Sequence, residues 1–154
     1  MKKNAKKNNK GFSLVELIIV VAIMAILIGV LGGQYLKFVE RSRQSADKSN
    51  VDEIVRALQI YAADPEASPA IKEDATGVVL TLSKENVMTI GDGTNKDAIV
   101  KALQEAGLVP ETFSNNTIKL KSDGWGTDGT VTVTIKVDGD GNVTATASDA
   151  DIMK

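Results

Sequence analysis

The chain has 154 residues, carries a formal net charge of −2 and contains neither cysteine nor histidine. A chain of this length accommodates one small domain together with an additional segment. The missing residue types exclude thiol catalysis, disulfide scaffolds and the usual zinc sites, and we expect no cofactor and no bound metal.

The N-terminal part begins with a basic leader, residues 1–11, and continues into an apolar segment. The leader contains Lys2, Lys3, Lys6, Lys7 and Lys10. The uncharged run from 17 to 36 has 20 residues, enough to span about 30 Å of hydrocarbon. Positive flanks stay in the cytoplasm, so the rest of the chain is expected on the outer side. A secretory signal or simple anchor shares these features, but the run lacks a small-x-small cleavage site.

Glu16 is the one carboxylate within this apolar segment. An unpaired carboxylate at the bilayer centre costs about 2.5–3.5 kcal/mol, so Glu16 is expected to have a partner. Together with the basic leader that ends at Gly11, the sequence Phe12-Ser13-Leu14-Val15-Glu16 resembles the class III signal of type IV prepilins. The resemblance covers about residues 7–33.

The resemblance implies a role for each of three residues. Gly11 and Phe12 would flank the bond cut by a prepilin peptidase, and the new N-terminus at Phe12 would be N-methylated. Glu16 would pair with the N-terminal amine of a neighbouring copy, because two charges that are costly in lipid lower that cost by meeting. The alternatives are a flexible junction at Gly11 and a carboxylate at Glu16 that reaches the membrane interface.

Three glycines lie in the apolar segment. Gly29 and Gly33 have the GxxxG spacing, which allows close helix packing but also arises often by chance. Many type IV pilins have a proline in this region, whereas this chain has Gly32-Gly33. Since each glycine costs about 1 kcal/mol of helix propensity, this pair is the expected weak point of the helix.

One helix is predicted from about Ser13 to Ala63, because no strong breaker precedes Asp64-Pro65. Residues 12–36 are apolar on all sides, and residues 37–63 are an amphipathic continuation. The face predicted to cover a sheet consists of Val51, Ile54, Val55, Leu58, Tyr61 and Ala62. The face predicted to be exposed consists of Asp47, Lys48, Asp52, Glu53 and Arg56.

The remaining residues, 64–154, are predicted to form a globular head. A loop over 63–77 is followed by a strand at 78–82 and a possible strand at 87–90. The capping-box sequence at 94–97 predicts a short helix.

The segment after this helix is less regular. Gly107 and Pro110 are expected to close the helix. Ile118 and Leu120 alternate with lysines and suggest an edge strand. For Trp125 we expect an exposed loop with the ring packed onto the sheet, although its segment faintly resembles one in major pseudopilins of type II secretion.

A β-hairpin is the clearest prediction near the C-terminus. Valine and isoleucine alternate with polar residues over 131–137, and a turn at 138–142 leads to a strand at 143–147. The turn could also begin a calcium loop, but Val143 stands where such a loop requires glycine, so the turn is preferred.

These elements predict an α+β fold, in which a long N-terminal helix packs on a small antiparallel sheet, as in type IV pilins. The resemblance implies a structural subunit without catalysis, a major pilin polymerised into an extracellular filament. The alternative is a pseudopilin of a type II secretion or DNA-uptake machine. A membrane-anchored binding or enzymatic domain would instead keep its leader.

The resemblance also implies partners and a location. The partners are other copies of the chain, minor pilins, a prepilin peptidase, an assembly ATPase with its platform protein, and the inner membrane before assembly. The precursor would be a single-pass membrane protein with a cytoplasmic leader. Cleavage would leave 13 of 18 basic residues against 20 acidic ones, a charge of −7 that argues against general nucleic-acid binding. The absence of cysteine weakly favours a Gram-positive source.

Overall fold

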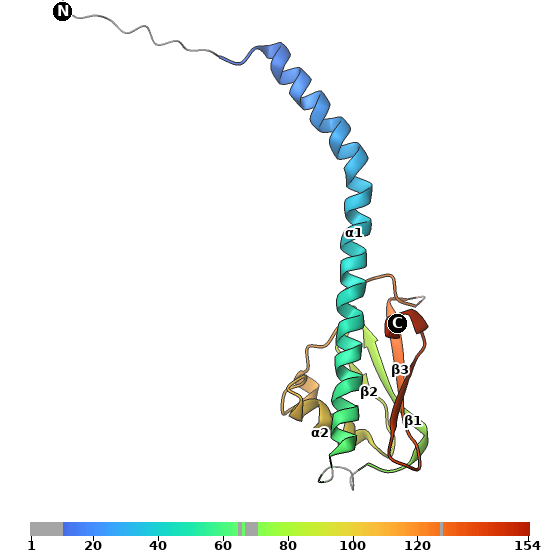
Figure 1. Ribbon diagram of the computed structural model, residues 1–154. Coiled ribbons are helices and arrows are strands. Elements are labelled where there is room, and N and C mark those ends of the chain that lie inside the picture. The colour runs from blue at the N-terminus through green and yellow to red at the C-terminus, as the bar shows by residue number, and fades with distance from the viewer. Residues whose placement is uncertain (1–10, 65, 67–70, 127) are drawn as a thin grey trace, which may run out of the picture. The chain divides into compact units, whose positions relative to one another are not determined.

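The computed structural model describes residues 11–64, 66, 71–126 and 128–154. The chain divides into two compact units, one ending at Val39 and one beginning at Glu40. The elements, shown in Figure 1, are α1 (Leu14–Ala63), β1 (Asp74–Ser83), β2 (Thr89–Ile90), α2 (Lys96–Glu105), η2 (Phe113–Asn115), β3 (Thr130–Val137), β4 (Val143–Ala147) and η3 (Ala150–Met153). The fold class is α+β, as predicted.

Helix α1 has 50 residues and agrees with the predicted span. The sequence contains no proline before Pro65, so every N–H beyond the first turn is available for the helical hydrogen-bond pattern. The helical conformation continues through Gly32 and Gly33. The glycine pair, although expected to be the weakest part of the helix, therefore does not interrupt α1 in the isolated subunit.

The four strands form one antiparallel sheet in the order β2-β1-β3-β4. Strand β1 begins at Asp74, earlier than the predicted start at Val78, because a bulge lengthens it. Gly77 occupies this bulge with φ +84°, and an added Cβ would lie 2.7 Å from the carbonyl oxygen of Ile135. Only glycine fits such a backbone conformation and such a close approach.

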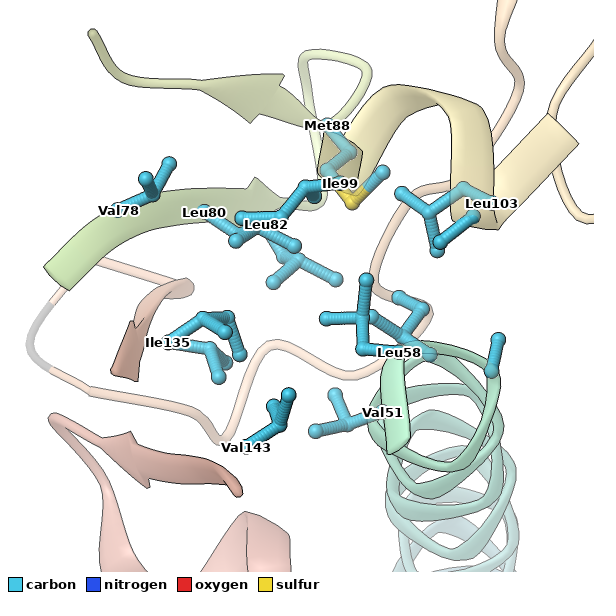
Figure 2. Packing of buried hydrophobic residues seen from close by; sticks show 14 of the residues in the cluster. Val51, Leu58, Val78, Leu80, Leu82, Met88, Ile99, Leu103, Ile135 and Val143 are labelled. Atoms are coloured by element: carbon cyan, nitrogen blue, oxygen red, sulfur yellow. The ribbon is translucent and has the colours of Figure 1, made fainter. Parts of the chain in front are cut away.

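The core of the second unit lies among α1, the sheet and α2. Figure 2 shows Leu58 of α1, Leu80 of β1 and Leu103 of α2 directed into this shared interior. The strict alternation predicted for β3 is confirmed, since every second residue from Val131 to Val137 is buried. The predicted inner face of α1 is also confirmed: Val51, Ile54, Leu58 and Tyr61 are buried, and Val55 and Ala62 are partly buried against the core.

The predicted edge strand at Ile118 and Leu120 is wrong. The backbone there makes isolated hydrogen bonds and no strand ladder: Met88 N–H, just before β2, donates to Ile118 O at 2.9 Å, and Leu120 N–H donates to Ser83 O of β1 at 3.0 Å. The next two N–H groups, of Lys121 and Ser122, donate to a carboxylate of α1 instead. A regular ladder therefore cannot continue along this segment.

The predicted capping box of α2 is also wrong, although the helix itself is confirmed. The N-cap is Asn95, whose side chain makes no capping hydrogen bond. Its amide instead accepts from Lys72 N–H at 2.9 Å and donates to Lys72 O at 2.8 Å. These two long-range bonds tie α2 to the chain that enters β1. Gly107 follows the helix with φ +72°, as a closing glycine should.

The turn between β3 and β4 is confirmed as a hairpin. Val137 pairs with Val143, and Asp138 N–H donates to Asn142 O at 3.1 Å. The Asp138 carboxylate accepts from the N–H groups of Asp140 and Asn142 at 3.0 and 2.8 Å. Its oxygens therefore stabilise the turn itself.

Candidate functional site

The first unit exposes an apolar helical surface. The large hydrophobic residues from Leu14 to Phe38 are exposed, from 49% at Val20 to 73% at Leu14. This part of α1 is long and apolar enough to cross a membrane, and none of it is buried within the subunit. Apolar patches of this size mark membrane or protein contact. The surface is therefore stable only when lipid or other protein covers it.

Glu16 lies in the first turn of α1, where its Oε2 accepts a hydrogen bond from Ser13 N–H at 2.9 Å. This is one half of a capping box, in which a glutamate at the third helical position reaches back to the N-cap residue. The negative charge also lies at the positive end of the helix dipole. The Ser-x-x-Glu spacing could have revealed this contact from the sequence.

The other N-terminal residues of the predicted site lie on the surface of the first unit. Gly11 and Phe12 precede the helix, and Phe12 is 89% exposed. A Cβ added at Gly29 or at Gly33 would meet no atom within 4 Å. The two glycines lie four residues apart and so share one helical face, where they leave the backbone accessible to an approaching helix. The hydrogen bond of the Glu16 side chain within the subunit goes to Ser13.

A second polar site, missed by the sequence analysis, lies in the second unit. The prediction that Asp47 is exposed is wrong, because this residue is fully buried. Its Oδ1 accepts from Lys121 N–H at 2.8 Å. Its Oδ2 accepts from Ser122 N–H and from Trp125 Nε1, both at 2.9 Å. Three donors thus compensate for the burial of one carboxylate.

Glu40 extends the same contact along α1. Its Oε1 accepts hydrogen bonds from the Ser122 hydroxyl and, at 3.2 Å, from Gly124 N–H. Trp125 is only 2% exposed and belongs to the hydrophobic core, while Asp123, Gly124 and Gly126 beside it are exposed, so the expected loop with a packed ring is confirmed. Two helix carboxylates therefore hold the segment 121–125 against α1. No local spacing predicts this, because the partners are separated by more than 70 residues of sequence.

The ionisable groups with altered pKa lie at turns and at helix ends. A hydrogen bond from the Asn142 amide holds the pKa of Asp138 below its usual range. The Lys96 ammonium lowers the pKa of Asp92 in the same way, at 2.7 Å. Among the described residues, no group of three His, Cys, Asp or Glu side chains could hold a metal ion. These charged groups stabilise the local turns and helix ends in which they lie.

The comparisons with known proteins agree with one another. Residues 6–32 match the family described as "Prokaryotic N-terminal methylation motif". The "Prepilin peptidase-dependent protein A" of Clostridium perfringens is 32% identical over 108 residues, which cover 68% of this chain and 74% of that protein. The "Fimbrial protein EcpC" of Eikenella corrodens is 30% identical over 130 residues, 82% of each chain.

A third relative matches over a shorter region. The "Type IV major pilin protein PilA" of Myxococcus xanthus is 39% identical over 56 residues, 36% of this chain and 26% of that protein. No solved structure shows a significant match.

Proposed function

The chain belongs to the type IV pilin-like family, and from that premise we propose that it is the major structural subunit of a type IV pilus. The observation that carries the proposal is the exposed apolar half of α1 with a single carboxylate in its first turn. Such a helix is insoluble by itself but can pass from lipid into a bundle of identical helices. The subunit would act as a building block and not as an enzyme.

Processing would occur at the bond between Gly11 and Phe12. Gly11 has no side chain to obstruct a protease cleft, and both residues are exposed ahead of α1. One relative is named for its dependence on a prepilin peptidase. Cleavage would remove the leader, residues 1–11, and methylation would leave the new amine at Phe12 cationic.

Assembly would use the carboxylate of Glu16. Its Oε2 holds Ser13 N–H within the same chain, which leaves Oε1 for the amine of a neighbouring copy. A pair formed between copies neutralises two charges that are both costly in an apolar fibre core. Gly29 and Gly33 would then allow the neighbouring helix to approach closely.

This proposal assigns a task to each segment. Residues 12–36 would span the membrane in the precursor and form the fibre core after assembly. Residues 37–63 would continue the helix, and residues 64–154 would form the head outside the membrane. The implied partners are other copies, minor pilins, the prepilin peptidase, and an assembly ATPase with its platform protein.

Mass spectrometry of fibres sheared from cells tests the proposal. We expect a subunit that begins at Phe12 and carries one methyl group on its amine. Negative-stain microscopy of the same material should show long fibres. A subunit that retains Met1 would contradict the proposal, whereas a processed subunit without long fibres would favour a pseudopilin.

A further inference from the structure

Strand β4 forms an open edge of the sheet, with a neighbour only at β3. Two flanking hydrogen bonds set the phase of the pairing: Asp138 N–H donates to Asn142 O, and Ser148 N–H donates to Thr132 O. The residues of β4 that bond to β3 are therefore the even-numbered ones. It follows that Val143, Ala145 and Ala147 direct their N–H and C=O groups away from β3, along the open edge.

This edge lacks the features that usually prevent strand pairing. Natural edge strands are protected by charged side chains, proline, bulges or extreme shortness. The run from Gly141 to Ser148 contains neither a charge nor a proline, and the β3–β4 register has no bulge. The opposite edge, β2, is only two residues long. Of the two edge strands that the structure describes, β4 is therefore the longer one, and it carries no feature that would prevent another strand from pairing with it.

We propose that β4 pairs antiparallel with β4 of a second copy, with Ala145 on the twofold axis. In this register Ala145 lies opposite the partner's Ala145, and Val143 lies opposite the partner's Ala147. All outward N–H and C=O groups of the three residues then find partners. Two four-stranded sheets become one continuous sheet, and the side chains that meet are small or β-branched.

Charge explains why a second copy fits this edge. Copies of the cleaved chain, at −7, repel one another over most of their surface. The eight residues between Asp140 and Asp149 are uncharged, so two copies approach there with the least repulsion. A twofold contact cannot propagate along a fibre built head to tail, so this contact would join two separate fibres. Many such β4–β4 contacts between two fibres that lie side by side would together give a high avidity and hold the fibres in a bundle.

The inference rests on the proposed function, because it requires fibres. The sequence contains no cysteine, so a cysteine introduced at one position can be crosslinked specifically. In the proposed register Thr144 lies opposite the partner's Thr146 as a close pair without backbone hydrogen bonds, at about 4.5 Å between Cα atoms. Thr144 and the partner's Thr144 are diagonal neighbours at roughly 7–8 Å, too far for a disulfide.

Fibres of Thr144→Cys and fibres of Thr146→Cys are prepared separately, mixed and exposed to a mild thiol oxidant. We expect at least about tenfold more disulfide-linked dimer in the mixture than in either preparation alone. Equal crosslinking in the single preparations, or none in the mixture, would overturn the inference. If both variants form fibres, the proposed function stands whatever the crosslinking shows.

Bundling supplies the second measurement. Thr146 is exposed on β4, and Thr89 is exposed on the opposite edge strand, which makes Thr89→Lys a matched control. Thr146→Lys should abolish the lateral bundles seen by microscopy while single fibres persist, because a lysine protects the edge. Bundles that survive in Thr146→Lys but disappear in Thr89→Lys would show that the contact is made by β2 and not by β4, and would overturn the inference.

Discussion

At the scale of one side chain, Glu16 has one observed task and one proposed task. Within the subunit it accepts a hydrogen bond from Ser13 N–H at the start of α1. Between subunits it is proposed to neutralise an amine. The first task needs only an oxygen acceptor, whereas the second needs a negative charge.

Two substitutions at Glu16 separate these tasks. Glutamine keeps the acceptor of a capping box but loses the charge, and alanine loses both. If the charge pair drives assembly, Glu16→Gln and Glu16→Ala should both insert and be cleaved, yet yield at least about tenfold fewer fibres, equivalent to a loss of about 1.4 kcal/mol. Immunoblots of membrane and sheared fractions provide the measurement. Normal fibre yield from Glu16→Gln would show that the charge is not required for assembly.

Asp47 is the polar residue on which the second unit depends most directly. Its replacement by alanine would leave the N–H groups of Lys121, Ser122 and Trp125 without this acceptor, and those of Ser122 and Trp125 are buried. We expect a loss of stability on the order of 3 kcal/mol. The midpoint of thermal unfolding should fall by roughly 10 °C.

The single tryptophan reports this change, since Trp125 donates to Asp47 itself. Fluorescence of the full chain in detergent should show a shifted Trp125 emission even before unfolding. Asp52→Ala, at an exposed position of the same helix, should change stability by less than about 0.5 kcal/mol. Equal stability of Asp47→Ala and Asp52→Ala would refute the structural role of Asp47.

At the scale of elements, the periodicity of the sequence predicted those helices and strands whose formation depends on neighbouring residues. The alternation in β3 and the helical spacing from Val51 to Tyr61 fixed which faces are buried. Ile118 and Leu120 alternate as well, yet they form no strand, because the following N–H groups bond to Asp47. Such partners are distant in sequence, and no periodicity reveals them. The half capping box at Glu16 is different, because the Ser13-x-x-Glu16 spacing is local and predicts it.

The β3–β4 turn gives a prediction about acid. The pKa of Asp138 is lowered chiefly by the hydrogen bond from the Asn142 side chain. A carboxyl whose folded pKa is depressed contributes stability above its unfolded pKa, and this contribution is lost as pH falls through the folded value. Asp138→Asn should therefore lower the unfolding temperature at pH 7, and the difference from the native chain should narrow below about pH 4.

Thermal unfolding of both chains at pH 7 and at pH 2.5 measures this difference. Asp52→Asn, on the exposed face of α1, is the control for a general charge effect. A gap between the native chain and Asp138→Asn that is the same at both pH values would show that the titration of Asp138 does not stabilise the turn.

At the scale of the whole molecule, the two units differ in the surroundings that they require. The second unit buries most of its apolar residues in its own core, whereas none of the first unit's described residues, 11–39, is buried. The subunit therefore belongs either in a membrane or in an assembly that covers its helix. The proposed basic leader would favour the membrane, because its five lysines would either remain on the cytoplasmic side or be removed.

Removal of the leader is thus the step expected to move the subunit from lipid to fibre. Gly11→Leu places a branched side chain at the proposed cleavage site, and we expect it to retain the leader, migrate as the larger precursor and stay in the membrane fraction. Ala5→Leu adds the same bulk within the leader but away from the cut, and should be processed normally. Electrophoresis of membrane and sheared fractions distinguishes the two variants. Fibres made from uncleaved Gly11→Leu would mean that an amine at Phe12 is not required, and the electrostatic match with Glu16 could then not guide assembly.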